Sequence, residues 1–322
     1  MKRIVKSVFI TGLFAVLMLF PALSIWAGGA RQGSQKAVRI GWSVQDLSNP
    51  IWAAMSEQYQ KVCESRGWEF TPVDCAADSG KQITQIENFI TSGVNVIVLQ
   101  PADPNSLADV TEKAHAKGIK MIGQGISFPQ ADVNVVDDNS QAGMMVGETA
   151  GKWIAERYGT RDPVEVAYFD WPYIKEAIDR SDGFDKGLAK TAPNARKAAN
   201  AAAANVTDGM NHAESMLQAN PNIRAFLCFG DGPGLGACEV LESKSVNAGD
   251  YGIFAIDATE EAMAKIKSGK TPFRMSVNLG APDEKVKIMV DVIEKALAGT
   301  AEKWYYNPIY MVDRSNVDQY LK

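Results

Sequence analysis

The chain has 322 residues, a formal net charge of −5 and only two histidines. The acidic balance makes nucleic acid and anionic membranes poor partners, and the scarcity of histidine nearly excludes histidine-based metal or nucleophilic chemistry. Neither a cofactor nor a metal is expected. The spacing of the four cysteines fits no metal site, and free, mostly buried thiols are expected at Cys63, Cys75, Cys228 and Cys238.

Residues 1–30 have the layout of a secretory signal peptide. Three basic residues precede an almost unbroken apolar run at 8–20, and small residues follow at 27–30. The apolar run is short for a membrane span, which needs roughly 20 residues. Cleavage after Ala27 or Ala30 would remove three positive charges and change the formal charge from −5 to −8. The mature chain is therefore expected to be exported, with an uncleaved membrane anchor as the alternative.

Strand-like and helical segments alternate along the rest of the chain. Strands are expected at residues 38–44, 68–74, 94–99, 120–124, 133–136, 164–170, 198–204, 223–229, 252–257, 273–277 and near 309–312. Segment 198–204 is rich in alanine, which favours helix, and is assigned to a strand only because the alternation requires one. The alternation predicts an α/β fold with parallel sheets, in two similar halves at about 37–138 and 139–278.

The segment 48–52 lies where the first strand is followed by the first helix, which is expected from about residue 51. A proline at position 50 suits a helix start. Asn49 and Trp52 should then lie at the carboxyl end of a strand, where open α/β sheets bind ligands. An amide beside an aromatic ring suits a small polyhydroxylated ligand. The alternative is a capped turn with a core tryptophan.

Seven short motifs follow one another in register behind the signal peptide. They are Ser48-Asn49-Pro50-Ile51-Trp52, Gln100-Pro101-Ala102-Asp103, Asp138-Asn139, Arg180-Ser181-Asp182-Gly183-Phe184, Gly230-Asp231-Gly232, Ile256-Asp257 and Asn278-Leu279. As a set, over essentially all of 37–322, they make the chain resemble type I periplasmic solute-binding proteins of the ribose/galactose-binding class.

This resemblance implies two doubly wound parallel-sheet lobes joined by a three-strand hinge. The chain would cross near residues 137–139, 278–279 and 307–309. The N-terminal lobe would comprise 37–138 plus 279–307, and the C-terminal lobe 139–278 plus 308–322.

The resemblance also implies a function. The chain would be a monomeric periplasmic receptor without catalytic activity that captures a monosaccharide or small polyol in the interlobe cleft. The lobes would close around it and deliver it to an ABC transporter permease. The alternatives are a non-carbohydrate solute, such as a nucleoside or signalling molecule, and docking on a chemoreceptor.

Eight residues are candidate ligand contacts. The motifs that match the family supply Asn49, Trp52, Arg180, Asp231, Asp257 and Asn278. Gln124 ends the expected strand 120–124 and is added as a further candidate. Trp171, with Tyr173 beside it, follows the expected strand 164–170 and is added as well. A carboxylate at the end of an apolar strand has no evident structural reason, and a guanidinium offers a planar fork of donors to hydroxyl oxygens.

Each candidate has a structural alternative. These are pairing of Arg180 with Glu176, an N-cap role for Asp257 before the helix at Thr259, a turn at Asp231, loop packing for Trp171 and Tyr173, and hinge-backbone contacts for Asn278. Trp42 is expected in the core and not at the ligand.

The chain departs from the family pattern at one place that affects ligand choice. Gly125 and Ile126 stand where many members carry an Asp-Arg pair that grips the sugar ring, and Gly230 replaces a usual asparagine. The expected site therefore has fewer charged and amide groups than a ribose or galactose site. A deoxysugar, a polyol or a less hydroxylated ligand would suit it better.

Two other functions are weighed against the receptor. The glycine-rich run 230–236, followed by Asp257 at the end of the next strand, suggests a nucleotide-dependent α/β enzyme, but its glycines alternate and Pro233 intrudes. A sugar-responsive repressor would need an N-terminal helix-turn-helix, and that place holds the signal peptide.

Overall fold

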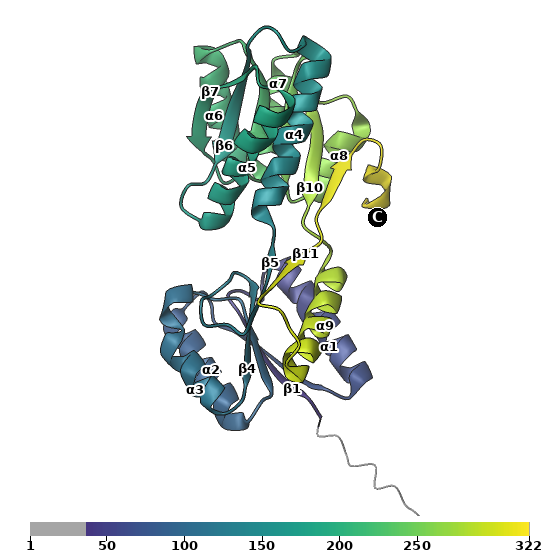
Figure 1. Cartoon of the computed structure of the whole chain (residues 1–322). Helices are drawn as coiled ribbons and strands as arrows, with labels where there is room; N and C mark the ends of the chain where they lie inside the picture. Colours follow the sequence, from purple (N-terminus) through teal and green to yellow (C-terminus); the bar gives the residue numbers. More distant parts are fainter. Residues whose placement is uncertain (1–36, 322) are drawn as a thin grey trace, which may run out of the picture. The chain divides into compact units, whose positions relative to one another are not determined.

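The computed structural model of the chain describes residues 37–321, and the expected signal peptide lies outside them. In this described part the chain forms two six-stranded sheets, each with helices on both faces (Figure 1). The predicted α/β fold class is confirmed.

The elements follow in chain order. The first half contains β1 (Arg39–Val44), α1 (Pro50–Arg66), β2 (Glu69–Asp74), α2 (Ser79–Ser92), β3 (Val96–Leu99), η1 (Pro104–Ser106), α3 (Ala108–Ala116), β4 (Lys120–Gly125) and β5 (Val133–Asp137). The second half contains α4 (Asn139–Tyr158), β6 (Val164–Asp170), α5 (Lys175–Thr191), β7 (Ala195–Ala202), α6 (Val206–Ala219), β8 (Ile223–Cys228), α7 (Asp231–Ser243), η2 (Ala248–Asp250), β9 (Gly252–Ile256), α8 (Glu260–Ser268) and β10 (Phe273–Asn278). The last segment contains α9 (Pro282–Ala298), β11 (Trp304–Asn307), β12 (Tyr310–Asp313) and η3 (Val317–Gln319).

The first sheet has the strand order β11-β5-β4-β3-β1-β2, and its neighbouring strands are parallel. Helices α1 and α9 contribute to a hydrophobic core on one face, while α2 and α3 contribute to a core on the other. All four residues of β3 are buried, as expected for a strand covered by helices on both faces.

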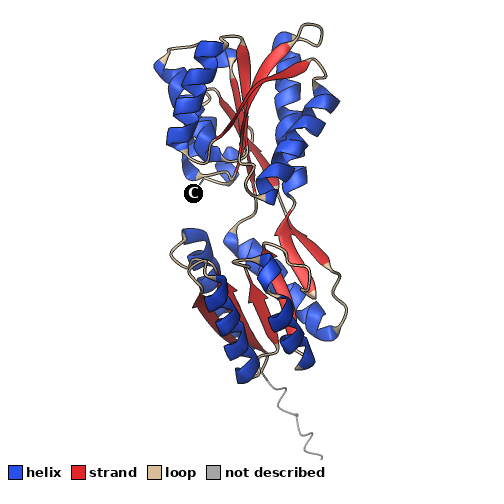
Figure 2. Cartoon of the chain, turned by 90° about the vertical axis from the view of Figure 1, so that its left-hand side faces the viewer, coloured by secondary structure: helices blue, strands red, loops and turns tan. Residues whose placement is uncertain are grey.

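The second sheet has the order β12-β10-β9-β8-β6-β7, in which only β12 runs antiparallel to its neighbour among the strands described. Helices α4 and α5 contribute to the core on one face, and α6, α7 and α8 to the core on the other. Figure 2 shows the strands of both sheets between layers of helices. The five residues of β9 are all buried, and each large apolar side chain enclosed in this way contributes about 1.5–3 kcal/mol to folding.

The chain passes between the two sheets three times, after β5, after β10 and between β11 and β12. In both sheets the strand order reverses beside the first strand of that half. Ligands of doubly wound sheets bind at such a reversal, outside the carboxyl ends of the strands. The loops after β1, β6, β8 and β9 leave from those ends.

Two strands differ most from the sequence prediction. β7 begins at Ala195, not at residue 198, because its register is set by pairing along β6 from Val164↔Ala195 to Asp170↔Ala202. The alanine-rich sequence of this edge strand does not show where the strand begins or ends. The sequence predicts no strand at β11. This strand is only four residues long and partly exposed, and it is held by parallel pairing with β5.

Candidate ligand-binding site

A cavity of about 630 Å³ lies at the carboxyl ends of the strands and is lined from both sheets. Asn49 and Trp52 line it from the start of α1, Asp257 from the end of β9, and Asn278 from the end of β10. Four of the eight predicted contacts therefore surround one cavity. Its size is within the range typical of small-molecule sites.

The start of α1 forms an aromatic wall of the cavity. Asn49 is the exposed N-cap of α1, and its Oδ1 accepts a hydrogen bond from the Ile51 N–H at 2.9 Å. The ring of Trp52 lies 6.1 Å from that of the fully buried Trp42, which occupies the core as expected. A Cβ placed on Gly125 would lie 3.4 Å from Trp52 Cη2. The indole thus covers one of the positions where the family pattern has charged residues.

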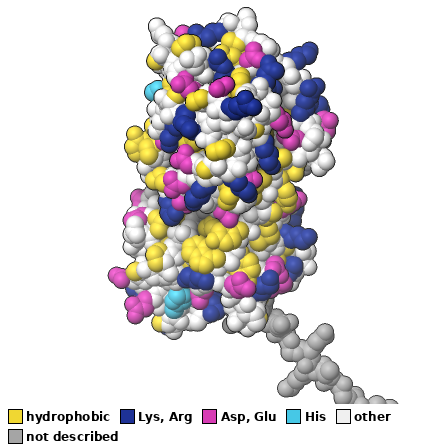
Figure 3. Space-filling view, turned by 45° about the horizontal axis from the view of Figure 1, so that its top comes forward, with side chains coloured by type: hydrophobic (Ala, Val, Ile, Leu, Met, Phe, Trp, Pro, Cys, Tyr) yellow, Lys and Arg dark blue, Asp and Glu magenta, His cyan; other side chains and the backbone are white. Residues whose placement is uncertain are grey.

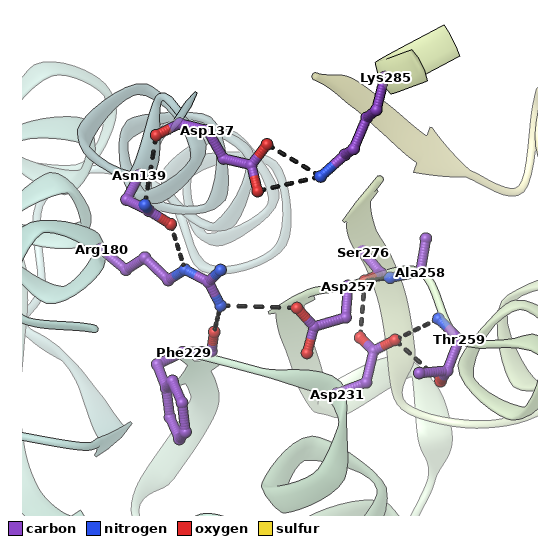
Figure 4. A network of polar contacts seen from close by, with 10 residues as sticks. All are labelled: Asp137, Asn139, Arg180, Phe229, Asp231, Asp257, Ala258, Thr259, Ser276 and Lys285. Carbon is purple, nitrogen blue, oxygen red and sulfur yellow. Dashed lines mark hydrogen bonds and ion pairs between the residues drawn. The ribbon is translucent and has the colours of Figure 1, made fainter. Parts of the chain in front are cut away.

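Arg180 and Asp257 form an ion pair at the carboxyl end of the strands of the second sheet (Figure 4). Arg180 Nη1 lies 3.5 Å from Asp257 Oδ1, and the two side chains are 12% and 43% exposed. Arg180 also donates from Nε to Asn139 Oδ1 at 2.8 Å and from Nη1 to the Phe229 carbonyl at 2.6 Å. The guanidinium is therefore fixed by three groups, and the alternative of a surface pair with Glu176 is wrong.

The backbone at Asp257 and Ala258 is strained. Their φ angles are +118° and +49°, a region that favours glycine. Such strain persists only where the surroundings impose it, and it concentrates at functional sites. The N-cap of α8 is Thr259, whose hydroxyl accepts from the Ala262 N–H, so the alternative N-cap role for Asp257 is wrong. The protein around the Asp257 carboxyl raises its pKa, and Arg180 opposes that rise.

Asp231 does not reach the cavity. It is the first residue of α7, fully buried, and both of its carboxylate oxygens accept hydrogen bonds from protein donors. Burial, together with the nearby charge of Asp257, raises the pKa of Asp231 to about 7. Asp231 is therefore not part of the cavity wall in this structure, and its burial at the start of α7 excludes the alternative of a simple turn residue.

Gln124 is also committed to the protein interior. Its Oε1 accepts from Trp42 Nε1 at 2.8 Å, and its Nε2 donates to the Tyr59 hydroxyl at 2.9 Å. Its side chain is only 4% exposed. A ligand contact would require breaking one of these buried hydrogen bonds, so we revise Gln124 to a residue that orients the aromatic core behind Trp52.

Of the two remaining predicted residues, Asn278 is part of the cavity wall and Trp171 is not. Asn278 lines it, and its Oδ1 accepts from the Gly280 N–H at 2.7 Å, as in the hinge-backbone alternative. Trp171 lies roughly parallel to Phe229, with ring centroids 6.5 Å apart, and makes an edge contact with Tyr173 at 4.9 Å. The ring of Trp171 therefore lies beside the ring of Phe229, the residue whose carbonyl accepts from Arg180.

Sequence reasoning misses two charged residues of the cavity wall, Asp137 and Lys285. Lys285 Nζ lies 2.9 and 3.1 Å from the two carboxylate oxygens of Asp137, and Asn307 Nδ2 donates to Oδ1 at 2.8 Å. Asp137 ends β5 at the first passage between the sheets, a position that could have marked it. Lys285 lies on α9, far away in the sequence, and nothing local marks it.

The glycine-rich run 230–236 is no phosphate-binding loop. Helix α7 begins at Asp231, so most of the run is helical. A Cβ on Gly236 would lie 2.3 Å from the Val206 carbonyl oxygen, and one on Gly209 would lie 2.4 Å from that of Pro233. The glycines therefore allow α6 and α7 to pack closely, which removes the main support for a nucleotide-dependent enzyme.

The state of the cysteines and the character of the helices can also be compared with the sequence analysis. All four cysteines are buried and free, in agreement with the predicted thiols. Within residues 37–321, no helix combines the length and the apolar character needed to cross a bilayer.

Comparisons with known proteins agree on one family. A family model described as periplasmic binding protein domain matches residues 40–301. The ribose import binding protein of Bacillus subtilis is 28% identical over 84% of this chain and 86% of its own length. A structure from Mycobacterium smegmatis in complex with β-D-fucofuranose is 25% identical, with a TM-score of 0.70, over 88% of this chain and 94% of that one. An ABC transporter solute binding protein from Bacillus halodurans with bound myo-inositol is 24% identical, with a TM-score of 0.72, over 90% and 99%.

Proposed function

This chain belongs to the periplasmic binding protein domain family, and on that premise we propose that it is an exported receptor for a neutral monosaccharide or small polyol. The observation that carries the proposal is the fixed Arg180–Asp257 pair at the carboxyl end of the strands of one sheet, with Asp257 lining a cavity that Asn49 and Trp52 line from the other. Ribose, fucofuranose and myo-inositol, which the relatives' names give, are all polyhydroxylated and uncharged.

The charges of the site support a neutral ligand. Arg180 is compensated by Asp257, and Lys285 by Asp137, so the ionised groups around the cavity cancel in pairs. A carboxylate can accept from two vicinal hydroxyls, and a guanidinium donates to ring or hydroxyl oxygens. Burying an unpaired polar group costs about 1–3 kcal/mol, so this site would reject ligands without matching hydroxyls.

The low polarity of the aromatic wall narrows the expected ligand class further. Trp52 lies against Gly125, where the family pattern places charge, and offers apolar surface to the ligand. A 6-deoxysugar or a cyclic polyol has apolar C–H faces that such a ring can cover. We therefore place these compounds ahead of ribose and galactose.

The same proposal covers the setting in which the receptor acts. Residues 1–30 would be removed on export, leaving a monomeric periplasmic protein without catalytic activity. Lobes comprising 37–138 plus 279–307 and 139–278 plus 308–322 would close over the ligand, because it contacts both. The closed form would deliver the ligand to an ABC transporter permease, with a chemoreceptor as the alternative partner.

Basic and acidic side chains are interspersed over the face drawn in Figure 3, which does not favour a nucleic-acid partner.

A thermal-unfolding panel on the mature protein tests the proposal. The panel comprises D-ribose, D-xylose, D-galactose, L-fucose, D-fucose, xylitol, myo-inositol, adenosine and L-leucine, each near millimolar concentration. A ligand at 100 times its Kd adds about 2.7 kcal/mol to the free energy of unfolding, which raises Tm by several degrees. We expect such a shift with a fucose or a cyclic polyol and none with leucine or adenosine.

Two variants identify the site of any shift. Arg180→Met should abolish it, because it removes the donor fork beside Asp257, which lines the cavity. Arg196→Met is the matched control, since Arg196 lies exposed on β7 and donates only to the nearby Pro193 and Ala195 carbonyls among the contacts described. No shift with any carbohydrate or polyol, or a shift that survives Arg180→Met, would contradict the proposal.

A further inference from the structure

The strained turn at Asp257 and Ala258 is held by a buried network behind the cavity (Figure 4). Thr259 donates to Asp231 Oδ2 from its N–H at 2.6 Å and from its hydroxyl at 2.9 Å. Ser276 donates from Oγ to Asp231 Oδ1 at 2.6 Å. The same Ser276 Oγ accepts from the Ala258 N–H at 2.9 Å. Two consecutive backbone amides of the turn are thus fixed, directly or through one hydroxyl, by a single carboxylate.

Asp231 and Ser276 do not line the ligand cavity, whereas Asp257 and Thr259 do. Asp231 and Ser276 are both fully buried, whereas Asp257 is 43% exposed. The Asp257 N–H donates to the Val277 carbonyl at 2.8 Å, which anchors the turn to β10. A residue in this unfavoured backbone region needs such external support. The support comes from three elements, α7, α8 and β10, that the sequence separates by up to 45 positions.

We infer that Asp231 and Ser276 are positioning residues, which hold the Asp257–Ala258 turn so that the Asp257 carboxylate meets both Arg180 and the ligand. The statement that Asp257 meets the ligand rests on the proposed function. It assigns to Asp231 a role different from the direct contact that the motif suggests. It also gives Ser276, which no motif marks, a part in affinity.

The geometry explains why one carboxylate is needed at this point. Three donors converge on Asp231, and its two carboxyl oxygens together accept all three. An alanine there would leave the Thr259 N–H and the Ser276 hydroxyl without this acceptor in a buried place. The turn could then relax toward ordinary backbone angles, and the Asp257 carboxylate would move away from Arg180.

Hydrogen–deuterium exchange of the ligand-free protein tests the positioning directly. The variants are Ser276→Ala, Asp231→Ala and Asp231→Asn, with Asp208→Asn as the matched control. Asp208 is also an acid in the first turn of a helix, but it is only partly buried and contacts residues 204 and 205. We expect faster exchange at the Ala258 and Thr259 amides in Ser276→Ala and Asp231→Ala, with β9 unchanged. Asp231→Asn should restore part of the protection, because its amide oxygen still accepts from Thr259.

Calorimetric titration with the panel compound that gives the largest shift tests the effect on binding. Losing one buried hydrogen bond of this network should weaken affinity about tenfold in Ser276→Ala, and Asp208→Asn should stay within about twofold of wild type. Unchanged amide exchange in Ser276→Ala, or faster exchange with unchanged affinity, would overturn the inference. If no panel compound binds the wild type, the proposed function fails, while the exchange experiment still decides whether the network holds the turn. If Asp231→Ala does not fold, Ser276→Ala, which removes a single hydroxyl, carries the test.

Discussion

A carboxyl group enclosed by protein is costly to ionise, and Asp231 is enclosed on every side. Its position one residue into α7, beside the ionisable Asp257, is set by the fold and not by a direct ligand contact. The hydrogen bonds from Ser276 and Thr259 favour the charged form, yet burial outweighs them, and the pKa lies at about 7. Asp231 is therefore expected to titrate near neutral pH.

This titration predicts a pH dependence of stability. The unfolded Asp has a pKa of about 3.9, so between pH 4 and 7 the folded state keeps a proton that the unfolded state has lost. The free energy of unfolding should then fall as pH rises through this window. Asp231→Asn removes the titration, so urea unfolding should show the wild type losing about 2–3 kcal/mol relative to this variant between pH 5 and pH 8. Parallel pH profiles for the two proteins would show that Asp231 is ionised throughout.

At the scale of elements, the contact between α4 and α5 sets the position of Arg180. The two helices approach so closely that a Cβ on Gly143 would lie 2.0 Å from the Arg180 carbonyl oxygen. A Cβ on Gly183 would lie 2.6 Å from the Ser140 carbonyl oxygen on the other helix. The glycines thus let α5 carry Arg180 up to Asn139, which lies at the start of α4.

Gly143→Ala should therefore affect both stability and binding. Helix propensity alone would make this change stabilising by about 1 kcal/mol, but the clash with backbone should force α5 away and cost about 1–3 kcal/mol instead. The displaced Arg180 should also bind the panel ligand more weakly. Gly80→Ala in the first turn of α2 is the control, because its Cβ would meet only the Asp78 side chain, at 3.3 Å. Urea unfolding and calorimetry measure both effects, and a Gly143→Ala protein as stable as wild type would contradict the argument.

The element scale also shows what the sequence can predict. Strands such as β6 coincide with their predicted bounds, since buried apolar runs are marked by local composition. Asn49, Trp52 and Asp257 could be anticipated because each lies where a recognisable strand or helix begins or ends. Arg180 lies inside α5 and could be anticipated only from the motif at 180–184. Ser276 and Lys285 could not, because their roles depend on partners 45 and 148 positions away in the sequence. The burial of Asp231 and Gln124 likewise arises from tertiary packing, which no local motif reveals.

At the scale of the whole molecule, the three passages between the sheets meet in one polar cluster. Asp137 ends β5 at the first passage, Lys285 lies in α9 soon after the second, and Asn307 ends β11 at the third. Lys285 and Asn307 both donate to the Asp137 carboxylate, so one side chain links all three segments. The Asp137 and Lys285 side chains are 17% and 16% exposed, which makes the pair much less screened than a surface ion pair.

Breaking the Asp137–Lys285 pair should destabilise the protein more than breaking an exposed ion pair would. Lys285→Met leaves the Asp137 carboxylate largely buried with only the amide of Asn307 beside it, and we expect a loss of about 2–4 kcal/mol in urea unfolding. The double variant Asp137→Asn with Lys285→Met removes both charges and should recover much of that loss. Lys113→Met is the control, because its 2.7 Å pair with Glu87 is 60% and 46% exposed and solvent-screened, so little change in stability is expected. Equal effects of Lys285→Met and Lys113→Met would show that the cluster does not tie the passages together. A large loss in the single variant that the double variant reverses would show that the loss comes from the unpaired charge of Asp137, which Lys285 compensates in the wild type.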